Sequence, residues 1–127
     1  MLKDCNSSAI VAVADIDRAR AFYEDTLGLG LIPGGEEDGV LGFQTGDTRL
    51  TVYRSEFAGT NQANAVTWDM KGDLVETVKD LEAKGVVFET YPDMGMTLNG
   101  VIHEAGPVKL VWLRDPDGNI LHLIEGM

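Results

Sequence analysis

The first part of the chain alternates between apolar runs and one segment with helical spacing. Residues 9–14 form a short apolar run rich in β-branched side chains, and Asp15 then supplies a helix N-cap. The segment after Asp15 places apolar residues three and four positions apart: Ile16, Ala19, Phe22, Tyr23 and Leu27. This pattern predicts a strand followed by an amphipathic helix, which ends at Gly28 in a left-handed C-cap.

Three further strands are predicted before the chain turns polar. Residues 29–32 resume the apolar run ahead of a Pro-Gly-Gly break. Residues 40–44 and 50–54 then read as a hairpin turned at residues 45–47. The order of elements is therefore strand, helix and three strands.

The same order returns after a polar link, residues 55–64. Residues 65–70 are the predicted strand, and Asp73 is the predicted N-cap, with Glu76 completing a capping box. The buried stripe of this helix consists of Leu74, Val78 and Leu81, and the helix ends at Gly85. Residues 86–88 form the next strand, and a hairpin of residues 109–113 and 120–125 turns across RDPDGN.

Two β-α-β-β-β modules predict an α+β fold. We expect one domain over residues 1–127, with module one at about 6–54, a linker at 55–64 and module two at about 65–126. Each helix can cover one face of a curved mixed β-sheet, which leaves the concave face to enclose a cavity.

Composition narrows the function classes. A net charge of −11 disfavours nucleic acid and anionic membrane surfaces as partners, whereas it either attracts cationic ligands or serves solubility. The one cysteine, Cys5, cannot form an intramolecular disulfide, and the N-terminus has no apolar signal core. The longest clean apolar run is too short to span a bilayer. We therefore expect a cytoplasmic protein.

Two motifs carry a family resemblance that covers nearly the whole chain. VADIDRARAFYEDTLGLG at residues 13–30 and LRDPDGNILHLIE at residues 113–125 resemble the first helix and last hairpin of the vicinal oxygen chelate superfamily. This superfamily includes glyoxalase I, extradiol dioxygenases, antibiotic-modifying enzymes and bleomycin-binding proteins. The resemblance implies the glyoxalase/bleomycin resistance/dioxygenase-like fold and an isologous homodimer.

The resemblance also implies where metal ligands would stand. The matching positions on first strands are Ser8 and Ala65, and those on last strands are Val52 (or Thr51 with a one-residue slip) and His122. Only His122 is a suitable donor, and a catalytic divalent ion needs about three. We therefore predict no metal and no cofactor. The alternative is a non-standard divalent site that recruits other side chains: His103, Glu104, Glu125 or Asp69.

Most of the candidate ligand-contacting residues belong to the second module. His122 alternates with Leu121 and Leu123, so it points away from the helix-packed face, and it is also the candidate proton-transfer residue. Trp112 is either cavity wall or core, whereas Trp68 has core parity. Segment 91–107 is either a lid over an apolar pocket or an irregular connection. The full candidate set is His122, Trp112, Ser8, Ile10, Tyr91, Met94, Met96 and His103.

Two functions from different classes fit these observations. The first is a metal-free binding protein that holds a small, partly aromatic or cationic molecule in the concave cavity. The second is an enzyme: a lyase or dioxygenase with relocated metal ligands, or a metal-free lyase or isomerase that uses His122 as acid or base. Fold resemblance alone does not separate them.

Overall fold

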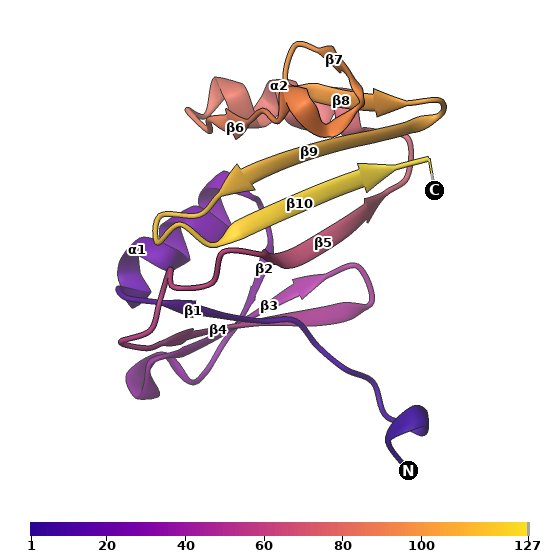
Figure 1. Ribbon diagram of the computed structural model, residues 1–127. Helices are drawn as coiled ribbons and strands as arrows, with labels where there is room; N and C mark the ends of the chain where they lie inside the picture. The colour runs from indigo at the N-terminus through magenta and orange to yellow at the C-terminus, as the bar shows by residue number, and fades with distance from the viewer. Residues whose placement is uncertain (127) are drawn as a thin grey trace. The chain divides into compact units, whose positions relative to one another are not determined.

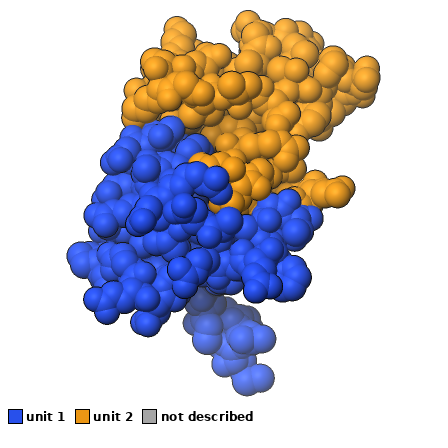
Figure 2. Space-filling view, turned by 90° about the vertical axis from the view of Figure 1, so that its left-hand side faces the viewer, with its two compact units in different colours: residues 1–60 blue, residues 61–127 orange. Residues whose placement is uncertain are grey.

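The computed structural model describes residues 1–126, which form two compact units (Figures 1 and 2). Unit 1 covers Met1–Thr60, and unit 2 begins at Asn61. The division falls inside the polar link expected at 55–64. The fold is α+β, with one mixed sheet and one main helix in each unit. The expectation that residues 1–127 act as a single domain stays a prediction.

Unit 1 contains a four-stranded sheet in the order β1-β4-β3-β2, in which only the β1–β4 pairing is parallel. The strands are β1 (Ile10–Val13), β2 (Gly30–Ile32), β3 (Val40–Thr45) and β4 (Thr48–Arg54). Alternate side chains are fully buried on one face: Val11, Val13, Leu41, Phe43, Leu50 and Val52. This face packs against the helix, as the two-residue period of a strand requires.

The first helix begins where the sequence predicts. The Asp15 carboxylate accepts a hydrogen bond from the Arg18 backbone N–H at 3.0 Å, and Ala19 and Tyr23 are buried. Only α1 (Ile16–Arg20) is α-helical, however, and its continuation η2 (Ala21–Thr26) is a π-helix. Gly28 follows with φ 74°, which confirms the predicted left-handed end.

Unit 2 contains a larger sheet in the order β5-β10-β9-β8-β7, with β6 also paired to β9. The β5–β10 pairing is parallel and the others are antiparallel. The strands are β5 (Asn64–Met70), β6 (Phe88–Glu89), β7 (Thr97–Asn99), β8 (Ile102–Ala105), β9 (Val108–Arg114) and β10 (Ile120–Glu125). The buried residues of the helix-packed face are Val66, Phe88, Val111, Leu113, Leu121 and Leu123.

Helix α2 (Leu74–Ala83) has the predicted buried stripe but not the predicted cap. Asp73 makes no side-chain capping hydrogen bond, so the capping box with Glu76 was wrong. The Leu74 N–H instead donates to Oε1 of Glu125 at 3.0 Å. Asp73 lies at φ −121° and ψ 20°, outside the extended region typical of an N-cap, and Glu125 at the end of β10 supplies the acceptor.

Segment 91–107 contains regular secondary structure, so it is not the irregular connection that was one of its two predicted forms. It begins with the short 3-10 turn η4 (Pro92–Met94) and then forms the β7–β8 hairpin, which extends the sheet from β9. All three residues of β7 are exposed. A strand with no buried face has no apolar alternation, which is why the sequence pattern missed it.

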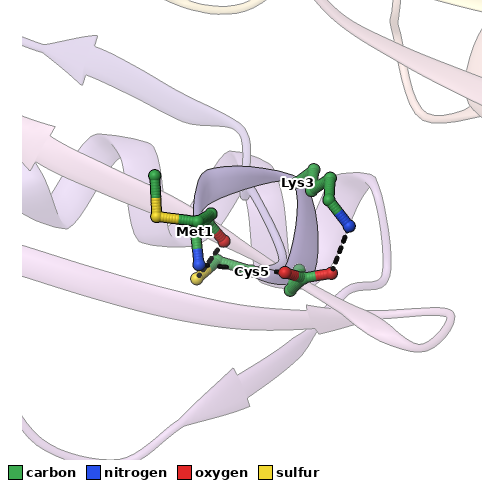
Figure 3. A network of polar contacts seen from close by, with 4 residues as sticks. Met1, Lys3 and Cys5 are labelled. Carbon is green, nitrogen blue, oxygen red and sulfur yellow. Dashed lines mark hydrogen bonds and ion pairs between the residues drawn. The ribbon is translucent and has the colours of Figure 1, made fainter.

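The first residues form η1 (Leu2–Asp4), which is held by contacts within residues 1–5 (Figure 3). The Cys5 thiol is unbridged and exposed, and it donates to the Met1 carbonyl oxygen at 3.6 Å. A second short 3-10 turn, η3 (Glu36–Asp38), precedes β3. Among residues 1–126, no helix is both long enough and apolar enough to cross a membrane.

Candidate functional site in unit 2

The face of the unit 2 sheet opposite α2 carries the candidate site. Leu121 and Leu123 point to the helix-packed core, so His122 between them points to the other face. On this open face His122 is paired with Thr67 of β5 on one side and with Trp112 of β9 on the other. His122 therefore points away from the helix-packed face, as its alternation with Leu121 and Leu123 predicts.

His122 is held by both of these neighbours. Its ring is stacked on the Trp112 indole, with centroids 4.9 Å apart and planes at 21°, and its Nδ1 lies 3.0 Å from the Thr67 hydroxyl oxygen. Desolvation by these surroundings lowers the pKa of His122 below its usual value of 6.5. The neutral form of the ring is therefore favoured at neutral pH. Its Nε2 is buried and has no hydrogen-bond partner within residues 1–126.

His103 lies on the same open face, where the sequence motifs did not place it. It belongs to β8, is 0% exposed, and accepts a hydrogen bond at Nε2 from the Tyr91 backbone N–H at 2.9 Å. With Nε2 accepting, the neutral ring carries its proton on Nδ1. That Nδ1 is also buried, with no partner in the described part of the chain.

Trp112 joins these residues into one group. Its indole meets the His103 ring edge-on at a centroid distance of 4.9 Å and the Tyr91 ring at 5.2 Å. We call Tyr91, His103, Trp112 and His122 the aromatic cluster. Trp112 is only 7% exposed and also lies on the open face. It is therefore both buried and part of the surface of the candidate site. Trp68, on the opposite face of β5, is half-buried.

An ion pair that sequence analysis missed borders the cluster. Arg114 pairs through Nε with Glu89, whose register partner on β9 is Trp112, and its Nη1 donates to the Gly118 carbonyl oxygen at 3.0 Å. The pair ties β6 to the turn between β9 and β10. Glu89 and Arg114 lie 25 residues apart and meet only through strand pairing, so no local sequence signal could have shown the contact.

The turn beside this ion pair is closed by its own side chains. The Asp115 carboxylate accepts hydrogen bonds from the Asp117 and Asn119 backbone N–H groups at 2.9 and 2.8 Å, and from the Asn119 amide at 2.8 Å. Gly118 takes φ 89°. DPDGN is thus the structural turn that its Pro and Gly indicate.

The other predicted ligand-contacting residues are placed less centrally. Met94 is exposed and Met96 half-buried, both between Tyr91 and β8. Ser8 and Ile10 belong to unit 1, where Ser8 is exposed and Ile10 is 61% exposed. Within unit 2, the structure brings together four of the predicted residues, which are the members of the aromatic cluster.

A comparison with models of protein families identifies the family of this chain. The model of the Glyoxalase/Bleomycin resistance protein/Dioxygenase superfamily matches residues 7–123. The chain belongs to this superfamily. The resemblance to vicinal oxygen chelate proteins, seen in the first helix and the last hairpin, is thereby confirmed.

Solved structures of the superfamily share the fold. The fosfomycin resistance protein FosX from Listeria monocytogenes has a TM-score of 0.71 at 13% identity, over 97% of this chain and 93% of that one. Lactoylglutathione lyase from Agrobacterium tumefaciens has a TM-score of 0.69 at 20% identity, over 96% and 93%. A putative glyoxalase family protein from Bacillus anthracis has a TM-score of 0.67 at 21% identity, over 97% of each chain. Comparison with curated proteins gave no significant match.

The metal ligands expected of this superfamily do not fit the residues present. Val52 is 0% exposed in the core of unit 1, so the open-face residue of β4 is Thr51, which pairs with Ile10. Ala65 offers a methyl group, which leaves His122 as the one imidazole at these positions. No group of three or more His, Cys, Asp or Glu side chains among residues 1–126 could hold a metal ion.

Proposed function

We propose that this superfamily member is a metal-free binding protein that holds a small, partly aromatic or cationic molecule against the aromatic cluster of unit 2. The observation that carries the proposal is the buried Nε2 of His122, which lacks a partner among the described residues. Leaving a buried polar atom unpaired costs about 1–3 kcal/mol. A ligand atom that bonds to Nε2 would remove this cost.

The surroundings of His122 suit a planar ligand. Trp112 and Tyr91 offer aromatic surface, and aromatic pairs gain about 0.5–1.5 kcal/mol beyond the area they bury. The net charge of −11 raises the local concentration of cations around the protein. Among the residues at the superfamily's expected metal-ligand positions, only His122 is a suitable metal ligand, which supports binding without a metal.

One observation favours a second function, a metal-free lyase or isomerase. The lowered pKa of His122 favours its neutral form at pH 7, and Nδ1 lies next to the Thr67 hydroxyl, which orients the ring. A neutral, oriented imidazole with an unengaged Nε2 can take a proton from a bound substrate. In this alternative His122 is the general base and the rest of the cluster positions the substrate.

The test is a thermal-shift screen of planar and cationic small molecules, followed by titration of each hit against His122→Phe. This variant keeps a ring on Trp112 but removes Nε2. A lost hydrogen bond of about 1 kcal/mol corresponds to about fivefold weaker binding, or more if the ligand is charged. Trp68→Phe, on the opposite face of the same sheet, is the matched control and should bind like the wild type.

Equal affinity of the wild type and His122→Phe would show that His122 is structural and would remove this site assignment. Substrate turnover that disappears in His122→Phe while binding persists would favour the enzyme. Elemental analysis of freshly purified protein should find no stoichiometric zinc, iron, manganese or nickel. About one metal ion per chain would contradict the metal-free proposal.

We further propose an isologous homodimer. Each sheet has two end strands, β1 and β2 in unit 1 and β5 and β7 in unit 2, which a symmetric partner could cover. Sedimentation at micromolar concentration should give twice the chain mass, and a monomer would contradict this. A cytoplasmic location stays a prediction.

A further inference from the structure

The open face of unit 1 contains a glycine whose small size serves a neighbouring side chain. Gly42 of β3 is paired with Thr51 of β4, and its φ is not positive, so the backbone does not require glycine there. A Cβ at Gly42 would lie 2.6 Å from both Nε and Cζ of Arg49, and Nη2 is also in contact. Such distances are far below van der Waals contact.

These contacts show how the Arg49 guanidinium lies. Several atoms of the group are nearly equidistant from the same point above Gly42, so the group lies flat across the glycine. Gly42 is buried even though it belongs to the open face, which agrees with this cover. The guanidinium edge, with its N–H donors, is thereby directed along the surface of the sheet.

Arg49 has no counter-ion in the described part of the chain. Among residues 1–126, no hydrogen bond or ion pair involves its side-chain nitrogens, although the protein contains 21 acidic residues. The neighbouring Gln44 amide is turned to the Gly46 carbonyl oxygen at 2.6 Å. A guanidinium stays charged at any physiological pH, and its planar fork matches the two oxygens of a carboxylate or phosphate.

We propose that Arg49, laid over Gly42 on the open face of unit 1, binds the carboxylate or phosphate group of a small ligand. Ile10, 61% exposed on the same face, offers apolar surface to the rest of that ligand. The site lies in unit 1 and does not depend on the function proposed for unit 2. Thr51, between Ile10 and Gly42, adds a hydroxyl group to this surface.

The experiment titrates the full chain with benzoate, phenyl phosphate and neutral benzyl alcohol at constant ionic strength. The readout is the NMR signal of the Arg49 Nε–H together with backbone amide shifts. We expect saturable shifts at Arg49 and Gly42 with the anions and none with the alcohol. The ratio of the two anion affinities distinguishes a carboxylate site from a phosphate site.

Two pairs of variants separate the site from general electrostatics. Arg49→Gln should weaken anion binding at least about tenfold, because a charge-assisted bond is lost. Arg54→Gln makes the same charge change on the same strand, in a separate hollow lined by Asp15, Asp17 and Glu36, and should have no effect. Gly42→Ala displaces the guanidinium and should weaken binding several-fold. Gly30→Ala, where the nearest atom is 3.6 Å from the new Cβ, should not.

Several results would overturn the proposal. These are no saturable shift with either anion, equal binding of benzyl alcohol, or equal losses in Arg49→Gln and Arg54→Gln. Sedimentation completes the test. Self-association that is lost in Arg49→Gln, without anion binding in the wild type, would assign this surface to a second copy of the chain instead.

Discussion

At the centre of their open faces, the two sheets have the same pattern of strand pairing but carry different side chains. In unit 1, Thr51 pairs with Ile10 and Gly42, and in unit 2 the corresponding His122 pairs with Thr67 and Trp112. Unit 2 thus has an indole where unit 1 has a glycine. The backbone repeat fixes positions, and the side chains at those positions decide the chemistry.

The two faces therefore differ in the charge of the side chain held near this position. In unit 2 the aromatic rings desolvate an imidazole and favour its neutral form. In unit 1 the missing side chain makes room for a permanent cation with no protein partner among residues 1–126. One repeat can therefore hold a neutral acceptor or donor in one copy and an anion-binding group in the other.

Removing the indole should have the largest effect. Trp112→Ala deletes a side chain that is 7% exposed and supports both histidines, so we expect a loss of about 3–5 kcal/mol in the free energy of unfolding. Urea denaturation measures this loss. Trp68→Ala, on the other face and only half-buried, should cost less. A loss below about 1 kcal/mol for Trp112→Ala would mean that the cluster does not stabilise unit 2.

The helix caps give the next largest effect. Glu125→Ala should cost about 1 kcal/mol in the free energy of unfolding, because the Leu74 N–H loses its acceptor. Asp15→Ala should cost a similar amount through the Arg18 N–H. Asp73→Ala is the matched control and should stay within about 0.5 kcal/mol, because it makes no capping bond. A large loss in the free energy of unfolding for Asp73→Ala would indicate that Asp73 does cap the helix, as the sequence predicts.

Filling the glycine of unit 1 should change stability little. Gly42→Ala introduces a Cβ that a flexible side chain can avoid, and alanine reduces the entropy of the unfolded chain. We expect a change below about 1 kcal/mol in the free energy of unfolding measured by urea denaturation, together with the several-fold weaker anion binding described above. A severe loss of stability would indicate that Arg49 is fixed in the fold and cannot move aside.

The smallest effect concerns pH. The pKa of His122 is lower in the folded chain than in the unfolded chain, so the unfolded state binds more protons between these two values. Stability is therefore full above about pH 6.5 and falls as pH decreases through the folded pKa. His122→Gln should remove this component from urea denaturation curves measured between pH 5 and 8. An NMR pKa at or above 6.5 for His122 would contradict the desolvation.

Features that depend on nearby residues could be predicted from the sequence. The Asp15 cap, the positive φ of Gly28 and Gly85, and the DPDGN turn are set by contacts a few residues apart. The alternation around His122 gave its face because the period of a strand is two. The family motifs gave the fold, which the family match over residues 7–123 confirms.

Contacts between distant strands could not be predicted in this way. The Glu125 side chain accepts a hydrogen bond from a residue 51 positions away, and His103 accepts one from Tyr91, 12 positions away. The pairing of β9 with β10 places Trp112 beside His122. His103 lies beside β9 because the β7–β8 hairpin pairs there, and its exposed β7 strand carries no apolar pattern.

The sequence by itself therefore determined both helices, most of the strands and their order, the Asp15 cap and the DPDGN turn. Tertiary structure decided which side chains share a face: the aromatic cluster, the Glu89–Arg114 pair and the guanidinium over Gly42. The physical reason is that hydrogen-bond register sets cross-strand neighbours, and a shift of one residue would turn each side chain to the opposite face.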